Sequence, residues 1–291
     1  MKSRSAYLTT ALLLFITTGS AQAQNPQAPP APSKLEKIAD DIYVIRGEGG
    51  NTTIYLTNEG VVLVDVKFDR NYEDIIAKVR SLTDKPVKYV FNTHSHPDHT
   101  GGNQKFLPAA QIIAHRNARA AMVEGKQSGL PQLTYSDEVS VNLGGREVIG
   151  RYFGRAHTNG DTWVYFPALK VLASGDSFNT GNGAGQTGST TFGFYIASGG
   201  SLVDITNTLD GVLKKWDVDI VVPGHGPLAK RADLVKWRDE GVKVRNRISE
   251  MVRQGKSKEE VTKMLIDEFG WDPKGRATLN SVDAMMSELR P

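Results

Sequence analysis

The sequence predicts an α/β fold in which sheets are covered by helices, and two observations carry this prediction. Short apolar runs alternate along the chain with longer amphipathic segments, in which apolar residues recur every three or four positions. The first of the apolar runs are separated by glycine-containing turns, as expected where strands follow one another directly. A chain that alternates in this way builds an α/β sandwich.

Three strands open the predicted fold, and a helix and a further strand follow. Residues 42–45, 53–56 and 61–66 are apolar runs with glycine-containing turns between them, which is typical of a meander. The period then changes to that of a helix over residues 72–79, and residues 87–92 form the next strand. A histidine-rich motif follows at the carboxyl end of this last strand.

A second series of strands and a group of helices complete the predicted fold. These strands are expected at residues 139–143, 148–153, 162–166, 170–173 and 219–222. Apolar residues from Leu202 to Trp216 fall mostly at spacings of three and four, which indicates a helix with one buried face. Another amphipathic helix is expected over residues 234–252, and Ser257 and Glu260 form a capping box that begins one more.

The strongest chemical signal is a cluster of histidines in the segment Thr93-His-Ser-His-Pro-Asp-His-Thr-Gly-Gly102. His94, His96, Asp98 and His99 lie within this segment, although the whole chain has only 6 histidines. Imidazole and carboxylate groups suit zinc and related divalent ions. Alternate residues of an extended loop point the same way, so we expect His94 and His96 to bind one ion while Asp98 and His99 reach a neighbouring one.

Three further residues strengthen the prediction of a metal site. His157 and His225 lie in glycine-containing turns after apolar runs, where a rigid sheet presents side chains to solvent. Asp176 ends another apolar run, and a carboxylate there can bridge two ions or close a turn through its side chain. His115 lacks a comparable partner and is expected to be structural.

This ordered set resembles the metallo-β-lactamase superfamily, whose dinuclear hydrolases carry HxHxDH, a later histidine, an aspartate and a final histidine. The similarity covers nearly all of the mature chain. It implies a four-layer αβ/βα sandwich with two mixed β-sheets flanked by helices and the metals at one edge. It also implies that Asp176 matches the bridging aspartate of the glyoxalase II type members. The first metal would be bound by His94, His96 and His157, and the second by Asp98, His99 and His225.

A centre with two metals predicts hydrolysis. Two cations lower the pKa of a shared water, so hydroxide forms near neutral pH and attacks a carbonyl without a side-chain nucleophile. Asp98 is the candidate catalytic residue, because its carboxylate can orient the nucleophile or pass on its proton. Two zinc ions are the expected cofactors, although the same ligands also accept iron and manganese. Asp161 is a candidate either to fix the His157 ring or to close its own turn.

The predicted substrate is a small acyl compound, selected by the loops around the metals. Residues 177–200 interleave glycines with polar and aromatic residues, among which Asn179 and Tyr195 are the candidate substrate contacts. Residues 48–51 are expected to form the opposite rim. A ligand set of histidine and aspartate is similar to that of the cysteine-free β-lactamases, whereas a bridging Asp176 is similar to that of thioesterases and lactonases. A hydrolase of lactams, lactones, esters or thioesters is favoured, with a class B β-lactamase proper as the alternative.

Two interpretations of a different class are weaker. Flavodiiron-type members, which are redox proteins, place a glutamate where this chain has His96, and they carry a flavin domain that has no counterpart here. A non-catalytic binding protein would usually have lost a ligand, whereas the whole set is present. The chain has no cysteine, so the β-lactamase subclasses whose second metal site needs one are excluded.

The amino terminus predicts export. Lys2 and Arg4 precede the apolar stretch 11–16, and small residues before position 24 offer a cleavage site, as in a secretory signal peptide over residues 1–23. The apolar core is too short to cross a bilayer, so no stable membrane span is expected after cleavage. Residues 24–33 would form a Pro-rich linker and residues 34–291 a single hydrolase domain. The protein is expected in the periplasm or outside the cell.

Charge gives no indication of a nucleic-acid partner. Removal of Lys2 and Arg4 from the 35 basic residues leaves 33, against 32 acidic residues. A nearly neutral exported protein lacks the basic surface that nucleic acids require. The sequence leaves the oligomeric state open.

Overall fold

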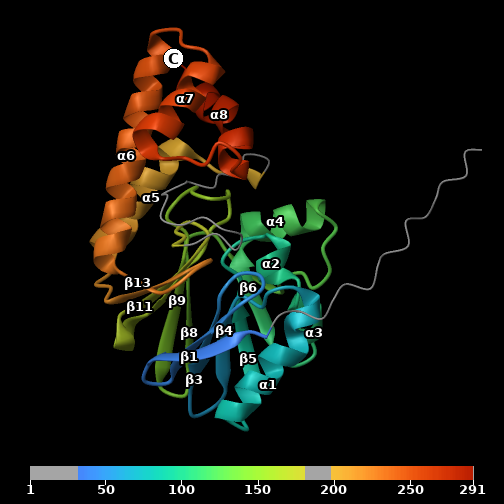
Figure 1. Ribbon diagram of the computed structural model, residues 1–291. Coiled ribbons are helices and arrows are strands. Elements are labelled where there is room, and N and C mark those ends of the chain that lie inside the picture. Colours follow the sequence, from blue (N-terminus) through green and yellow to red (C-terminus); the bar gives the residue numbers. More distant parts are fainter. Residues whose placement is uncertain (1–31, 181–197, 291) are drawn as a thin grey trace, which may run out of the picture.

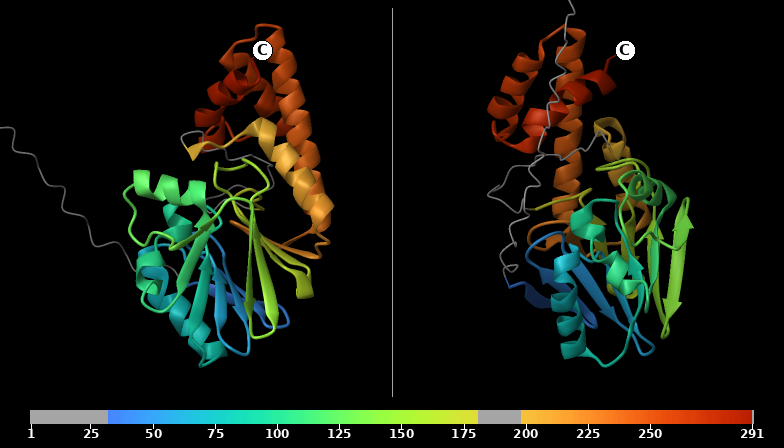
Figure 2. Two further views of the ribbon diagram at one scale, coloured as in Figure 1. Left: turned by 180° about the vertical axis from the view of Figure 1, so that it is seen from behind. Right: turned by 90° about the vertical axis from the view of Figure 1, so that its right-hand side faces the viewer.

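Two β-sheets pack face to face between helices in the computed structural model, which describes residues 32–180 and 198–290 (Figure 1 and Figure 2). This layering confirms the predicted αβ/βα sandwich with two mixed sheets. The predicted signal peptide, most of the Pro-rich linker and Tyr195 lie outside the described residues, so they stay predictions.

Seven strands form the first sheet in their sequence order. They are β1 (Lys34–Ala39), β2 (Ile42–Arg46), β3 (Thr52–Leu56), β4 (Val61–Val64), β5 (Val87–Phe91), β6 (Gln111–His115) and β7 (Leu133–Tyr135). The strands β2 to β4 pair antiparallel as the predicted meander, β1 adds an antiparallel strand that the sequence analysis does not predict, and β4 to β7 pair parallel. β4 ends two residues earlier than predicted, because Asp65 adopts the left-handed backbone conformation with a φ of 58°.

Six strands form the second sheet, in the order β13-β12-β11-β10-β9-β8. They are β8 (Glu138–Leu143), β9 (Arg146–Arg151), β10 (Trp163–Phe166), β11 (Val171–Gly175), β12 (Ile220–Pro223) and β13 (Ala229–Lys230). β10 is antiparallel to both β9 and β11, and β12 is parallel to β11. The strands β9, β11 and β12 therefore end at the same edge of the sheet.

The core divides between the inside of the sandwich and its two outer faces. Val62 and Val64 of β4 belong to the inner cluster, whereas Val61 and Leu63 face the outer helices. This alternation is expected of a strand that is buried on both sides. In the inner cluster Tyr55 meets Phe166 of the other sheet edge to face, with ring centroids 5.1 Å apart. The shared core fixes one sheet against the other and so places the loops at their edge.

Helices cover both outer faces. The four shorter helices are α1 (Tyr72–Leu82), α2 (Pro97–Thr100), α3 (Asn103–Phe106) and α4 (Arg116–Glu124), and α1 and α3 pack on the first sheet. On the second sheet lie α5 (Leu202–Lys215) and α6 (Arg231–Arg253), and α7 (Lys258–Phe269) and α8 (Arg276–Glu288) pack in turn on these two helices. The helices predicted around 72–79, 202–216 and 234–252 are confirmed, as is the capping box of Ser257 and Glu260. Within the described ranges no helix is long and apolar enough to cross a bilayer.

The last helix is tied back to the loops at the edge of the sandwich. α6 extends from β13 to the far end of the molecule, where α7 and α8 pack against it (Figure 1). Glu288 of α8 accepts hydrogen bonds from the Ser201 hydroxyl and, at 2.9 Å, from the amide of Leu202 at the start of α5. The Arg155 guanidinium lies 3.6 Å from the same carboxylate. Because Arg155 is two residues from His157, the carboxyl-terminal helices contact the loop that carries a predicted ligand.

Candidate metal centre

The seven predicted metal ligands lie together at one edge of the sandwich, and each follows a strand. The set comprises His94, His96, Asp98 and His99 after β5, His157 after β9, Asp176 after β11 and His225 after β12. The extended loop expected through the motif ends at His96, because Pro97 begins the short helix α2 that carries Asp98 and His99. Strand order thus brings together residues that are far apart in the sequence.

His94, His96 and His157 form one group of nitrogen donors. The Nδ1 atom of His96 lies 3.0 Å from the Nε2 atom of His94 and 3.0 Å from the Nε2 atom of His157. The rings of His94 and His157 are buried. Two ligands of one zinc ion, each about 2.0–2.1 Å from the metal, are roughly 3.0–3.4 Å apart. The three ring nitrogens therefore have the spacing of ligands around a single ion.

Asp98, His99 and His225 form a second group beside the first. The Oδ2 atom of Asp98 lies 3.1 Å from the Nε2 atom of His225 and 3.6 Å from the Nε2 atom of His99. The two ring nitrogens are 3.3 Å apart. These separations again fit one ion held by two imidazoles and a carboxylate.

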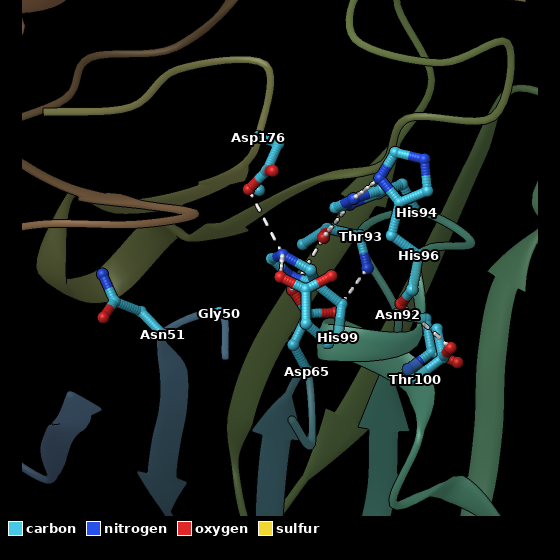
Figure 3. A network of polar contacts seen from close by, with 12 residues as sticks. Gly50, Asn51, Asp65, Asn92, Thr93, His94, His96, His99, Thr100 and Asp176 are labelled. Carbon is cyan, nitrogen blue, oxygen red and sulfur yellow. Dashed lines mark hydrogen bonds and ion pairs between the residues drawn. The ribbon is translucent and has the colours of Figure 1, made fainter. Parts of the chain in front are cut away.

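Asp176 lies between the two groups and turns one oxygen toward each. Its Oδ2 atom is 3.6 Å from the Nε2 atom of His157, whereas its Oδ1 atom is 3.2 Å from the Nε2 atom of His99 and 3.4 Å from that of His225. Figure 3 shows the contact between Asp176 and His99. Among the described residues, none gives this buried Oδ1 atom a hydrogen bond of acceptable geometry. A buried carboxylate oxygen that lacks a well-formed hydrogen bond is unfavourable, and a bound cation beside it would compensate its charge. The donors therefore fit two metal ions with Asp176 between them.

The rings of His94 and His96 in the first group are neutral near pH 7 in the metal-free protein. Burial, together with the neighbouring His99 and His96, lowers the pKa of His94 well below its usual value. Burial and the neighbouring His157 lower the pKa of His96 to about 4. Neutral imidazole is the form that binds a metal ion.

The second group carries protons instead. Burial opposes a charge on His99, but Asp176 and Asp65 outweigh it and hold the pKa of the ring well above its usual value. Burial likewise opposes a charge on His225, whose pKa the carboxylates of Asp176 and Asp98 raise to about 9. Burial would raise the pKa of Asp176, yet these two rings hold it well below its usual value. The carboxylate charge is thus balanced by protons that a metal would displace.

Asp65 and Thr93 support both groups, and the sequence prediction misses them. The Oδ2 atom of Asp65 lies 2.7 Å from the Nδ1 atom of His99 and accepts a 2.7 Å hydrogen bond from the Thr93 hydroxyl. The same hydroxyl lies 3.0 Å from the Nδ1 atom of His94. One carboxylate therefore orients a ring in each group, as is common around metal ligands. The signal that points to Asp65 is its place directly after the apolar run of β4.

Two glycines allow loops to approach the centre closely, and neither was singled out from the sequence for this reason. A Cβ atom at Gly50 would overlap the ring of His99, and one at Gly224 would overlap the Oδ1 atom of Asp176. Any larger residue would displace a predicted ligand.

Asn179, a predicted substrate contact, binds the loop of His225 in this structure. Its Oδ1 atom accepts a 2.8 Å hydrogen bond from the amide of His225. Asn51 fixes the same turn, because its Nδ2 atom donates to the carbonyls of Pro223 at 2.9 Å and Gly226 at 3.0 Å. A substrate contact of Asn179 stays a prediction.

His115 and Asp161 make local contacts. The Nδ1 atom of His115 accepts a 3.3 Å hydrogen bond from the amide of Asn117 at the start of α4, and its Nε2 atom donates to the carbonyl of Ser136 at 2.9 Å. The structural role expected of His115 is confirmed. Asp161 accepts hydrogen bonds from the amide and the hydroxyl of Thr158, at 2.9 and 2.6 Å, and so closes its own turn.

Comparison with solved structures supports the fold. A metallo-beta-lactamase from Pontibacter korlensis superposes with a TM-score of 0.64 at 20% identity, over 71% of this chain and 97% of that one. The DIM-1 metallo-beta-lactamase gives a TM-score of 0.63 at 19% identity, over 74% of this chain and 99% of that one.

Sequence relatives are also found among characterised proteins. The metallo-beta-lactamase type 2 of Bacillus cereus is 29% identical over 199 residues, which are 65% of this chain and 72% of that protein. The 2,4-dinitroanisole O-demethylase subunit alpha of Nocardioides sp. (strain JS1661) is 32% identical over 220 residues, which are 72% of this chain and 61% of that protein.

A family model covers the sandwich itself. It is described as the metallo-beta-lactamase superfamily and matches residues 45–225, which include every predicted ligand and end before α6. The match spans more than half of the chain, so the chain belongs to the metallo-beta-lactamase superfamily and is a hydrolase of that fold.

Proposed function

We propose that the protein is an exported hydrolase that holds two zinc ions and cleaves a small acyl substrate at its carbonyl carbon. The observation that carries this proposal is the position of Asp176, which turns one oxygen toward each ligand group. A bridging aspartate resembles the thioesterase and lactonase members of the family more than most β-lactamases. A lactone, ester or thioester is therefore favoured over a lactam.

The proposed ligands divide between the two ions. His94, His96 and His157 would hold the first ion, and Asp98, His99 and His225 the second, with Asp176 shared between them. Bound cations of this kind supply a water of lowered pKa and polarise a carbonyl oxygen. Histidine and carboxylate ligands suit zinc, and they also accept iron and manganese.

Asp98 is the proposed catalytic residue of the chain. Its side chain is 27% exposed, so a substrate can reach it, whereas His99 behind it is fully buried. Burial opposes its charge, but His225 and His99 outweigh this effect and lower the pKa of its carboxyl group. An ionised carboxylate beside the centre can accept the proton of the attacking water and pass it to the leaving group. Asp65 and Thr93 would keep the ligand rings oriented during this transfer.

A class B β-lactamase proper is the second candidate. The relative from Bacillus cereus favours it, because that protein is named as a metallo-beta-lactamase. The two candidates differ in the role of Asp176. A β-lactamase that leaves Asp176 off the metals would keep most of its lactam turnover in the Asp176→Asn variant, whereas a bridging Asp176 makes that variant lose metal and activity together.

A panel of substrates tests the proposal. Zinc-loaded mature protein would be assayed for kcat/KM on a thioester, a lactone, a chromogenic cephalosporin and a carbapenem. 2,4-Dinitroanisole is added because the relative from Nocardioides acts on an aryl methyl ether by its name. We expect the thioester or the lactone to be cleaved most efficiently. Efficient lactam turnover would instead identify a β-lactamase, and turnover of the ether alone would reject an acyl substrate.

Two further measurements test the metal and the export. Metal analysis of the purified protein should find two zinc ions per chain, and iron with little zinc would contradict the choice of metal. Mass spectrometry of the protein from the periplasmic or culture fraction should find a chain that begins at Gln24. A chain in the cytoplasm that keeps residues 1–23 would contradict export.

A further inference from the structure

Lys67 is a fully buried lysine that the proposed chemistry does not use. Its ammonium group donates hydrogen bonds to the backbone carbonyls of Gly50 and Glu48, the latter at 3.2 Å. Burial lowers the pKa of Lys67 to about 8, and the nearby Asp65 and Asp74 oppose the shift. An ammonium group out of water is unfavourable unless hydrogen bonds compensate it. The two carbonyls are therefore firmly tied to this side chain.

The backbone around Lys67 is itself bound to the metal motif. Asp65 and Lys67 both adopt left-handed conformations, with φ values of 58° and 55°, which are uncommon for residues other than glycine. The amide of Val66 donates to the carbonyl of His99 at 2.8 Å, and the amide of Gly102 donates to the carbonyl of Lys67 at 3.2 Å. The two hydrogen bonds fix the position from which the lysine side chain reaches the rim segment, residues 48–51.

The rim segment contacts Asp98, His99 and the turn that carries His225. The amide of Gly50 donates to the carbonyl of Asp98 at 2.9 Å, and the same glycine lies against the ring of His99. The amide of Asn51 donates at 2.7 Å to the carbonyl of Gly224, which precedes His225. Figure 3 shows Gly50 and Asn51 to the side of His99, at the start of β3. A shift of this segment would therefore displace three proposed ligands at once.

We propose that Lys67 is a positioning residue that holds the rim segment against Asp98, His99 and the turn of His225. The lysine acts through backbone carbonyls and not as a catalytic group. The inference rests on the proposed function, because it assigns Lys67 to the support of the second metal. It distinguishes the two proposed metals, since the contacts of the rim segment described above are with Asp98, His99 and the turn of His225.

The variant Lys67→Met tests the inference, because methionine keeps most of the buried volume and removes the donors. Stepwise zinc affinities would be measured by competition with a chromogenic chelator. We expect the affinity of the Asp98–His99–His225 group to fall roughly 10- to 100-fold, as for other residues that orient ligands, and that of the three-histidine group to change little. Lys170→Met is the matched control, because Lys170 is an exposed lysine paired with Asp217 on the surface.

A second readout needs no metal. Hydrogen exchange of the Gly50 amide in the metal-free protein reports its bond to Asp98 directly. This exchange should become at least about tenfold faster in Lys67→Met and stay unchanged in Lys170→Met. Unchanged exchange and unchanged affinity in Lys67→Met would overturn the inference. An equal loss at both metals would also overturn it, because general destabilisation predicts that result.

Chemical rescue covers the case in which Lys67→Met does not fold. The chain has no cysteine, so the variant Lys67→Cys carries a single thiol that can be alkylated in the unfolded state before refolding. Bromoethylamine restores an amine at nearly the original length, whereas bromopropane restores only the bulk. Recovery of the second metal with the amine alone supports the inference, and equal behaviour of the two adducts overturns it. Wild-type protein that binds fewer than two metals would contradict the proposed function, while the Gly50 exchange would still decide the role of Lys67.

Discussion

The two ligand groups lie side by side, yet the fold prepares them for a cation in different ways. Burial and mutual repulsion keep the rings of His94 and His96 neutral without a metal. Asp176 and other carboxylates hold protons on His99 and His225, and residues from distant strands hold these rings in place. His94 and His96 can therefore bind a cation without losing a proton, whereas His99 and His225 must first release protons.

This difference indicates which metal is easier to lose. The three-histidine group joins two short loops, whereas the second group depends on the rim segment, on Asp65 and on the turn around His225. When more residues are needed to hold a ligand in its orientation, more substitutions can weaken metal binding. We therefore expect the two sites to differ in their response to mutation and to pH, and the second site to respond more.

The largest effect should follow Asp98→Ala, which removes the proposed proton acceptor and one ligand of the second group. We expect kcat/KM to fall by roughly 10²- to 10⁴-fold, as is typical for the loss of a general base. The far-UV circular dichroism and the first metal should be retained. Asp69→Ala is the control, because Asp69 is an exposed aspartate paired with Lys105. Undiminished turnover in Asp98→Ala would reject the proposed centre.

Asp65→Asn should separate the two groups most clearly. The amide keeps the shape of the side chain but loses the charge that faces His99 at 2.7 Å. We expect zinc affinity at the second group to fall about 10- to 100-fold. The first group should lose less, because Asp65 reaches His94 only through Thr93. Stepwise zinc titration measures both constants, and loss of the first metal alone would reverse the comparison.

The pH dependence of metal binding should also differ between the groups. The pKa of His225 is raised to about 9 and that of His99 lies well above its usual value, so both rings are protonated at pH 7 without metal. Zinc must displace these protons, and its affinity for this group should fall about tenfold per pH unit for each proton as the pH decreases. The pKa of His96 is about 4 and that of His94 lies well below its usual value, so these two rings should contribute little to the pH dependence of the first zinc affinity between pH 6 and 8.

Titration calorimetry in buffers of different ionisation enthalpy counts the protons released at each step. We expect release at the second step and almost none from His94 and His96 at the first. Release of equal numbers of protons at both steps would contradict the proposed difference in protonation between the two groups.

The smallest effect on metal binding should come from Glu288→Ala. Glu288 contacts Arg155, which lies two residues before His157 of the first group. Without this carboxylate, the amide of Leu202 loses a hydrogen bond and the guanidinium of Arg155 loses one of its ion pairs. We expect the free energy of unfolding to fall by about 1–3 kcal/mol, with at most a few-fold change in the first zinc affinity. Urea unfolding measures the stability, and Glu250→Ala on the exposed face of α6 is the control. A complete loss of the first metal would show that this group too depends on remote support.

The grouping of the seven proposed ligands could be predicted from the sequence because their signal is mostly local. Four of them lie in one HxHxDH segment, and the others follow apolar runs that the structure shows to be strands. Their supports could not be predicted in the same way. Asp65, Gly50 and Lys67 act on His99 and Asp98 through contacts that exist only once β3, β4 and β5 are adjacent.

The fold could be predicted where burial leaves a pattern. The buried strands β2 to β5 are apolar runs, and the long helices α5 and α6 have an apolar stripe. β1 was missed because its KLEKIA segment is charged and mostly half-buried. The sequence predicts an extended loop where the structure has helix α2, because the Pro-Asp-His-Thr segment is short and polar and lacks a helical pattern of apolar residues.

Anomalous diffraction at the zinc edge, from crystals of zinc-loaded protein, would show directly whether Asp176 joins two metals. We predict two peaks roughly 3.5–4 Å apart. Each peak should have one of the two Asp176 carboxylate oxygens about 2.0–2.2 Å away from it. A single peak, or two peaks with Asp176 turned away from either, would contradict a bridged pair of metals at this edge of the sandwich.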